Sequence, residues 1–284
     1  MKKIFIATAL LLATGYTNAQ TDTSTQKVDT VRIGGMIIVK KDGQNGENGK
    51  DGKNNVSIQI GGGKSSRKNK KITTNWGTVD IGFNNFSDKT DYNSAATQAF
   101  TGNATPAFSE NDFTLKNNSL NINVWIVRQR MGISKDNKFN FTWAVGIETN
   151  NYKFENNVSF IKSAAPQYVK RDEIEFKKNK LATSYLTVPL MLGYNAKPNR
   201  GGFTVNAGAS IGYLYSSRNK QISDQRGKEK NKGNFNLVAW KLSLVGEIGW
   251  GSVKAYGSYT PKSIFKSGLD FQPYAVGIRL LGWD

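Results

Sequence analysis

Hydrophobic and polar residues alternate one by one along most of the chain from Trp76 to the C-terminus. The clearest example is a pair of runs, 185–194 and 203–215, in which every second residue is apolar and many of the others are Gly, Thr, Ser or Asn. Successive side chains of a β-strand point to opposite faces, so this period of two predicts two strands, each with one apolar face. The link between them, 195–201, is rich in Asn, Pro and Gly, which predicts a hairpin turn.

Six further segments show the same alternation and bring the predicted number of strands to eight. They are 78–83, 120–127, 139–148, 238–248, 253–259 and 274–280. A strand of about ten residues with a period of two is long enough to cross a bilayer obliquely. The strands of a soluble β-sandwich alternate in the same way, so the pattern alone leaves both architectures open.

The connections between the predicted strands alternate in length. Three are short, at 132–137, 195–201 and 249–252. Four are longer, at 84–117, 150–180, 216–234 and 261–271. Outer-membrane barrels combine short periplasmic turns with long external loops. We therefore expect an all-β fold in which residues 76–284 form an eight-stranded antiparallel transmembrane β-barrel.

Aromatic residues at the ends of the predicted strands support a membrane barrel. One set lies beside the short connections and consists of Trp76, Phe139, Tyr194, Phe203 and Trp250. A second set lies beside the long connections and consists of Tyr213, Tyr215, Trp240, Tyr259 and Tyr274. Two such sets are typical of the aromatic girdles at the two surfaces of a bilayer.

The N-terminal part of the chain lacks this pattern. Residues 1–19 combine two lysines, a short apolar run and small residues before Gln20, which predicts a signal peptide that is cleaved during export. Residues 20–75 are expected to form a short, partly disordered periplasmic segment, with two short strands at 28–39 and 55–60. The glycines that recur at every third position between these strands are too few for a collagen-like helix and favour a flexible loop. The basic run 64–71 has two interpretations: it forms part of a solvated linker, which is favoured, or it contacts anionic lipid.

The composition excludes several kinds of chemistry. The chain contains neither Cys nor His. Disulfides, thiolate or imidazole metal sites and every mechanism that uses His are therefore excluded. We identify no catalytic, cofactor-binding or metal-binding residue and expect a protein that is not an enzyme. An enzyme with a Ser-Lys or carboxylate mechanism is the least favoured class, because no spacing of residues points to one.

The predicted strands carry charged residues on their polar faces, which would line the lumen of the barrel. These residues are Asp80, Glu148, Lys241, Glu247, Lys254 and Arg279. Eight strands enclose a lumen that side chains can only just fill, so we expect the six charges to form a structural network of salt bridges. Pro189 lies within a strand although a closed barrel has no free edge, which predicts a bulge or a locally opened hydrogen-bond ladder there.

Basic residues exceed acidic residues, with 39 Lys and Arg against 21 Asp and Glu and a formal net charge of +18. Residues 150–180 hold seven Lys or Arg against four acids, and residues 216–234 hold six against two. These loops would either form a solvated external surface, which is the favoured interpretation, or bind lipopolysaccharide or another polyanion.

One strand carries a recognisable motif, Tyr-Leu-x-Val-Pro-Leu, formed by Tyr185, Leu186, Val188, Pro189 and Leu190. With its Lys-Pro turn and the following glycine-rich strand, it resembles the PorT-like outer-membrane β-barrel family over residues 76–284. The resemblance implies an eight-stranded barrel in the outer membrane of a Gram-negative bacterium. It implies no single activity, although the founding members take part in secretion.

The sequence therefore favours an outer-membrane barrel with a structural, interaction or secretion-associated role. The expected partners are outer-membrane lipid and other envelope or secretion proteins, with no cofactor and no nucleic acid. The oligomeric state and the ligand are open. Binding of lipopolysaccharide or another polyanion through the basic external loops is the main alternative.

Overall fold

The computed structural model describes residues 71–164, 166–198, 202–251 and 253–280, and the backbone of three short strands that precede them. The predicted signal peptide, the glycine-rich segment and most of the basic run at 64–71 lie outside the described residues. In the part of the chain that is described, no helix has the length and apolar character needed to cross a membrane. The chain divides into two compact units, Met1–Arg67 and Lys68–Asp284.

The first unit contains a three-stranded antiparallel sheet with the strand order β1-β2-β3. Its strands are β1 (Val28–Ile33), β2 (Met36–Lys41) and β3 (Asn55–Ile60). The prediction of one continuous strand over 28–39 is wrong, because this segment forms two antiparallel strands paired from Ile33 and Met36 outward. The pair Gly34-Gly35 separates the two strands in the sequence.

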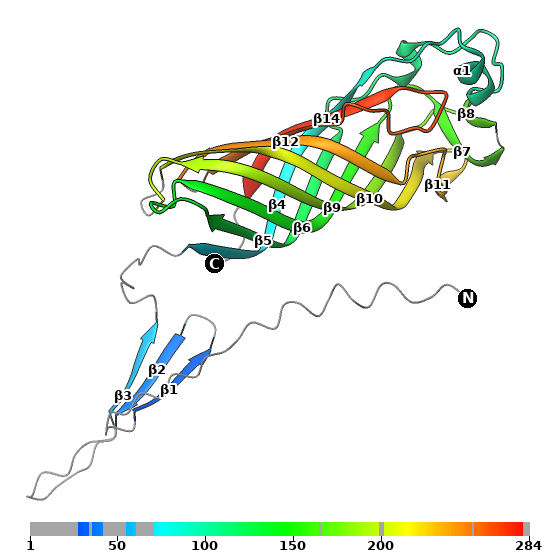
Figure 1. Cartoon of the computed structure of the whole chain (residues 1–284). Helices are drawn as coiled ribbons and strands as arrows, with labels where there is room; N and C mark the ends of the chain where they lie inside the picture. Colours follow the sequence, from blue (N-terminus) through cyan, green and yellow to red (C-terminus); the bar gives the residue numbers. More distant parts are fainter. Residues whose placement is uncertain are drawn as a thin grey trace, which may run out of the picture. The chain divides into compact units, whose positions relative to one another are not determined.

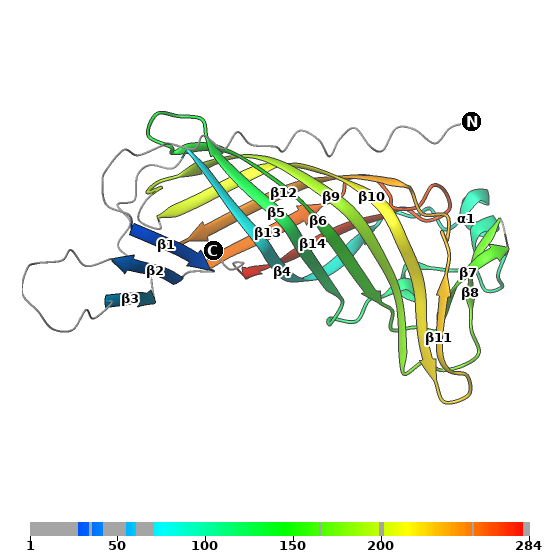
Figure 2. The same cartoon turned by 90° about the horizontal axis from the view of Figure 1, so that it is seen from below.

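The second unit is built on a closed ring of eight antiparallel strands, which confirms the predicted strand number. In ring order they are β4 (Ile72–Asp88), β5 (Leu120–Gly132), β6 (Phe139–Lys153), β9 (Lys178–Asn195), β10 (Phe203–Ser223), β12 (Trp240–Trp250), β13 (Val253–Tyr259) and β14 (Phe271–Leu280). Pairing of β14 with β4 closes the ring (Figure 1; Figure 2). The strand β4 begins at Ile72, earlier than the predicted start at Trp76. Closure leaves no unpaired edge among these eight strands, which is how a barrel satisfies its backbone hydrogen bonds.

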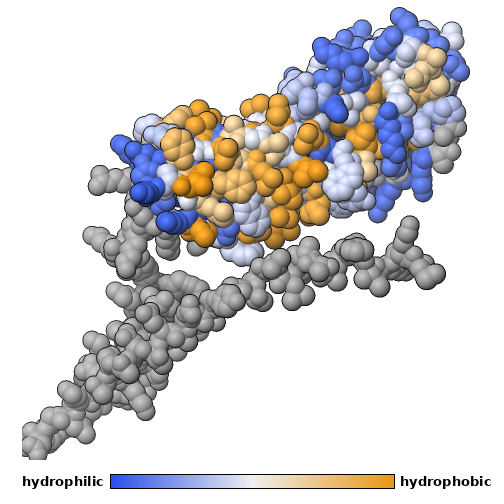
Figure 3. Space-filling view, viewed as in Figure 1, coloured by the Kyte–Doolittle hydropathy of each residue, from blue (hydrophilic) through white to orange (hydrophobic). Residues whose placement is uncertain are grey.

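Apolar side chains cover the outer surface of the barrel. Large hydrophobic residues on all eight strands are exposed, including Phe83, Ile126, Leu192, Leu244 and Val276. The space-filling view shows this apolar surface as a band between two polar ends (Figure 3). Both predicted aromatic sets face outward. They include cross-strand pairs such as Phe139 with Tyr194, whose ring centroids are 5.3 Å apart, and Tyr213 with Trp240, at 4.9 Å.

One end of the barrel, here called the short-turn end, carries the three short connections, and the opposite long-loop end carries a folded cap (Figure 1). The cap contains α1 (Ala95–Phe100), the 3-10 helix Glu110–Phe113, β7 (Val158–Ala164), β8 (Gln167–Arg171) and β11 (Gly227–Lys232). The segments 84–117, 150–180 and 216–234 connect strands of the ring as predicted, but they also contain these elements, which the sequence pattern did not predict. These segments contain elements without a hydrophobic period, and β11 is polar throughout.

Aromatic residues form the core of the cap. Sixteen buried apolar side chains form one cluster at this end, and it includes Phe100, Phe113, Phe154, Phe160, Phe265 and Phe271. Ion pairs also connect the surface of the cap, among them two that involve arginine. Arg171 Nε lies 2.8 Å from Asp112 Oδ1, and Arg226 binds Asp172 with Nη1 2.9 Å from Oδ2. The cap therefore has its own hydrophobic core above the ring of strands.

Irregularities in the neighbouring strands β4 and β5 change which of their side chains face inward. The register of β5 against β6 shifts between Trp125 and Val127, which leaves Ile126 as an extra residue. The facing residue of β4, Gly77, has a φ of 65°, a conformation that glycine adopts without strain. On either side of this glycine, Trp76 is 62% exposed whereas Thr78 is 1% exposed. The inner and outer faces of both strands therefore exchange at this level.

The expected irregularity at Pro189 takes the form of an opened ladder. The pairing of β9 with β6 passes from Leu190, opposite Trp143, to Thr187, opposite Gly146, without a paired residue at Val188 or Pro189. On the other side of β9, Pro189 stays in register with Ser210. The strand keeps its alternation, with Leu186 and Leu190 exposed outside and Tyr185 buried inside. The missing proline N–H therefore affects one ladder only.

Candidate functional site

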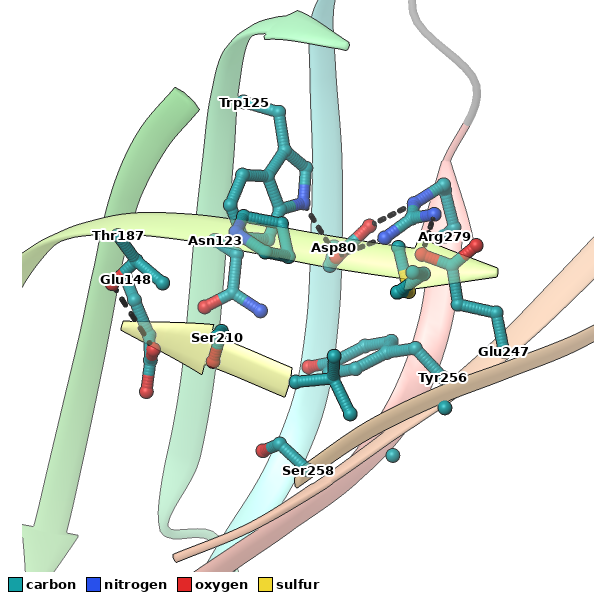
Figure 4. Close-up of a pocket in the computed structure, with 15 residues that line it drawn as sticks. Asp80, Asn123, Trp125, Glu148, Thr187, Ser210, Glu247, Tyr256, Ser258 and Arg279 are labelled. Carbon is teal, nitrogen blue, oxygen red and sulfur yellow. Dashed lines mark hydrogen bonds and ion pairs between the residues drawn. The ribbon is translucent and has the colours of Figure 1, made fainter. Parts of the chain in front are cut away.

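The lumen holds the main concentration of buried charge in the described barrel. Arg279 on β14 lies between two carboxylates. Its Nε is 2.6 Å from Asp80 Oδ1 and its Nη2 is 2.8 Å from Asp80 Oδ2, while its Nη1 donates to Glu247 Oε1. Figure 4 shows this arginine with Asp80 on β4 and Glu247 on β12. All three side chains are almost fully buried, so the ion pairs are shielded from solvent.

Neighbouring donors complete the coordination of both carboxylates. Trp125 donates its indole Nε1–H to Asp80 Oδ2 over 2.7 Å. Arg128 forms a bidentate pair with Glu247, with Nη1 2.9 Å from Oε1 and Nη2 2.6 Å from Oε2. Asn206 donates to the same carboxylate over 3.2 Å. The network therefore joins β14, β4, β5, β12 and β10 through charge-assisted hydrogen bonds, which are the stronger class.

A second group of charges lies nearer the long-loop end. Lys241 forms an ion pair with Glu148. The carboxylate also accepts hydrogen bonds from Asn150 Nδ2 at 2.9 Å and Thr187 Oγ1 at 3.3 Å. The Lys241 ammonium lies 4.5 Å from the ring centroid of Tyr185, a cation–π distance. This group connects β6, β9 and β12 across the lumen.

The structure places the six sequence-predicted charges as follows. Asp80, Glu148, Lys241, Glu247 and Arg279 lie in the lumen and form ion pairs. Lys254 is in register with Arg279 but makes no ion pair among the described residues. Sequence reasoning missed Arg128, because a strict period of two places it on the outside. The extra residue Ile126 reverses that assignment for Arg128 and for Arg130, which is in register with the fully buried Thr142. The lumen therefore holds more bases than acids.

The space left inside the barrel is small. The cavity between Asp80, Glu148, Glu247, Tyr256 and Arg279 has a volume of about 30 Å³, and Figure 4 shows the side chains that line it. A cavity of about 10 to 15 Å³ already holds one water molecule, so this one has room for water but is far smaller than a ligand pocket of several hundred Å³. In the described residues, no group of three or more acidic, His or Cys side chains is arranged to hold a metal ion. This part of the lumen is thus a filled polar core rather than a substrate pocket.

Comparison with known proteins identifies a family. The family model described as "Outer membrane protein beta-barrel domain" matches residues 77–266. No curated protein gives a significant match. Two crystal structures of Ail, the attachment invasion locus protein of Yersinia pestis, are similar at 11% identity, each covering 72% of this chain and 99% of that chain. Their TM-scores are 0.29, and 0.28 for the complex with the heparin analogue sucrose octasulfate. Scores this low carry no argument about this chain.

Proposed function

Because the chain belongs to the family of outer membrane protein β-barrel domains, we propose that it is a non-catalytic transmembrane protein with a sealed barrel. In this proposal the barrel anchors the folded cap at the cell surface. The apolar outer band, with an aromatic set at each end, supports a position across the bilayer. The long-loop end then faces outward and the short-turn end faces the periplasm.

The observation that carries the proposal is that two separate barriers close the barrel. Within the lumen, the cavity beside the ion-pair network has a volume of only about 30 Å³. At the long-loop end, the aromatic cluster of the cap covers the mouth with buried apolar side chains such as Phe113 and Phe271. A pore needs a continuous aqueous path, and a filled lumen supplies none. The cap is therefore the part that is available to partners.

The cap is suited to binding because it is rigid and exposed. Its aromatic core and its ion pairs Arg171–Asp112 and Arg226–Asp172 hold the loops in fixed positions. The PorT-like motif at Tyr185–Leu190 supports partners among envelope or secretion proteins. A second candidate function is the binding of a polyanion at the long-loop end. It is favoured by outward-facing lysines on β9, β10 and β11.

The sealed barrel predicts the absence of stable conductance. Purified full-length protein inserted into planar lipid bilayers should give no sustained current steps, because ions cannot cross the lumen network. Insertion should be checked in parallel by the shift in gel mobility on heating, which folded barrels show in SDS. A large, stable conductance from protein that shows this shift would contradict the proposed sealed barrel.

The orientation predicts which turns are accessible on intact cells. An epitope tag inserted between Asp224 and Lys230, in the turn after β10 or the first part of β11, should bind antibody without permeabilisation. A tag inserted between Lys197 and Arg200, in the connection between β9 and β10, should bind only after the outer membrane is opened. The reverse result would mean that the proposed topology is wrong.

A further inference from the structure

Basic side chains form a continuous row on the outer face of the wall at the long-loop end. Four lysines on neighbouring strands are in direct register. Lys153 on β6 is opposite Lys180 on β9, which is opposite Lys220 on β10, which is opposite Lys230 on β11. Residues in register lie on the same face of a sheet with about 5 Å between them. The row therefore extends over about 15 Å.

Further bases flank this row on the same face. On one side, Arg218 is opposite Lys232, and on the other Ile222 is opposite both Lys178 and Lys228. The complete set, here called the outer basic face, is Lys153, Lys178, Lys180, Arg218, Lys220, Lys228, Lys230 and Lys232. No acidic residue belongs to these three rows of paired residues. The eight charges are therefore uncompensated within the face itself.

A bulge in β10 turns part of this face outward. The register of β10 against β9 shifts between Leu214 and Ser216. Before the shift, odd-numbered residues such as Tyr213 face outward, and after it the odd-numbered Asn219 is buried. Arg218 and Lys220 consequently point away from the lumen. A strict alternation through all the residues from Tyr213 onward would instead place them on the inner face.

Like charges opposite each other on a sheet lower its stability, so this arrangement is costly in isolation. Lys180, which lies beyond the apolar band, is close to four of these cations. Partial burial and the neighbouring cations Lys178, Lys220, Arg218 and Lys153 lower the pKa of Lys180 to about 8. An anion placed over the rows would relieve this repulsion. The face therefore has the electrostatic character of a binding surface for an anion.

The height of the face above the membrane selects the kind of anion. The last outer row of the apolar band contains Leu186, Tyr213 and Trp240. With a rise of about 3.3 Å per residue and a strand tilt of about 40°, the outer basic face lies roughly 10 to 20 Å further out. The polar headgroup layer of a bilayer is only about 5 to 8 Å thick on each side. The phosphates of ordinary phospholipids do not reach most of the face.

Groups that can bind sugars lie between the apolar band and the bases. Thr149, Ser184 and Ser216 form a row of hydroxyl groups in register across β6, β9 and β10. Beside this row, Tyr215, Ser216 and Lys232 contribute to the lining of an open hollow of about 310 Å³. A hydroxyl row and a hollow with an aromatic ring offer hydrogen bonds and a stacking surface for a saccharide. With increasing distance from the membrane, the outer surface of this wall is thus first apolar, then lined by hydroxyl groups and then basic.

We propose that the outer basic face binds the phosphate groups on the saccharide head of a glycolipid in the outer leaflet, such as lipopolysaccharide. Its acyl chains would lie along the apolar band, its inner sugars over the hydroxyl row and its outer phosphates on the lysines. This inference rests on the proposed transmembrane position. The bound lipid would hold the wall formed by β6, β9, β10 and β11 against the membrane.

The test measures binding of lipopolysaccharide to folded full-length protein in a zwitterionic detergent. The probes are rough-type phosphorylated lipopolysaccharide, the same preparation after chemical dephosphorylation, and soluble inorganic polyphosphate. Each base near a charged surface contributes about 1 kcal/mol, so the triple variant Lys180→Gln, Arg218→Gln, Lys220→Gln should bind the phosphorylated probe on the order of a hundredfold more weakly. Dephosphorylation should weaken binding to the unmutated protein to a similar extent.

A matched control removes three charges from the same end of the molecule but from outside the face. Lys89, Lys262 and Lys266 are exposed there, and their replacement by Gln should leave binding within about threefold of the unmutated protein. If the strand triple loses the heat-dependent gel shift, a second triple at Lys228, Lys230 and Lys232 replaces it. These residues are exposed on β11 and lie outside the ring of eight strands.

Four results would overturn the proposal. Equal losses in the face and control triples would mean that only net charge matters. Undiminished binding of the dephosphorylated probe would exclude the phosphates as ligands. Tighter binding of polyphosphate than of lipopolysaccharide would assign the face to a soluble polyanion. If the unmutated protein shows the heat shift but binds no lipopolysaccharide, only this inference is contradicted. If carbonate extracts the protein from membranes, the proposed transmembrane function itself is contradicted.

Discussion

Replacement of Arg279 by Ala is expected to lower the free energy of unfolding by about 3 to 5 kcal/mol, the usual cost of removing one partner of a buried ion pair. The physical reason is that Arg279 neutralises both Asp80 and Glu247. Without it, Asp80 has only the Trp125 indole as a donor among the described contacts, and Glu247 depends on Arg128 and Asn206. Urea unfolding of the protein refolded into lipid vesicles, followed by tryptophan fluorescence, measures the change.

The lumen supplies a matched control for this prediction. Lys254 is in register with Arg279 on the inner face but makes no ion pair among the described residues. The variant Lys254→Ala should therefore change the free energy of unfolding by less than about 1 kcal/mol. The Glu247→Ala variant, which removes the shared partner of Arg128 and Arg279, should resemble Arg279→Ala. If the Arg279→Ala and Lys254→Ala variants have the same free energy of unfolding, the network does not stabilise the barrel.

Replacement of Phe271 by Ala is expected to destabilise the cap by about 3 to 5 kcal/mol, because it removes a buried aromatic ring and leaves a cavity. Its ring stacks on Phe86 with centroids 4.0 Å apart and meets Phe113 and Phe265 edge to face at 5.2 and 5.6 Å. Opening of the cap should accelerate proteolysis of the long loops on intact cells. The lumen network remains closed in this variant, so conductance should stay absent.

Phe83 is the control for the cap. It lies on the same strand as Phe86 but is 65% exposed on the apolar band, where lipid fills the space that a smaller side chain leaves. Phe83→Ala should therefore not change the rate at which the loops are cleaved. Equal cleavage of the Phe83→Ala and Phe271→Ala proteins would show that Phe271 does not hold the cap together. Conductance in the Phe271→Ala protein would instead show that the lumen network is not a barrier.

The strands of the barrel could be predicted because their environment is simple. Lipid on one side and a polar lumen on the other require a period of two, and Leu186, Thr187 and Leu190 follow it. The cap could not be predicted in this way. Its core collects single aromatic residues from several loops, for example Phe113 and Phe160, and these have no common period. Only the folded chain brings them together.

The charges of the lumen were predictable only as far as the strands are regular. Asp80, Glu148 and Arg279 follow the period of their strands, and they lie on the inner face. Arg128 lies beyond the extra residue Ile126, so its sequence position indicates the wrong face. The available signal in the sequence was Gly77, because a glycine between Trp76 and Thr78 interrupts the alternation of β4. In the structure this glycine has a left-handed backbone conformation. The sequence shows that residue 128 is a charged arginine, but it does not show which face of the strand the side chain occupies.

The extra residues at Gly77 and Ile126 lie at the same level on adjacent strands, where Trp76 is opposite Val127 and Thr78 is opposite Trp125. Because each strand carries one, the pairing of β4 with β5 keeps its register through the irregularity. Loss of Ile126 alone would leave Arg128 and Arg130 facing the lumen, because Trp125, Val127 and Arg128 would then alternate regularly, but it would leave Gly77 without a facing residue and set β4 and β5 out of step. Loss of both residues together would restore the pairing and keep both arginines inside. Deletions in this part of the wall are therefore tolerable only as coupled events on both strands, which constrains the order in which such a sequence can change.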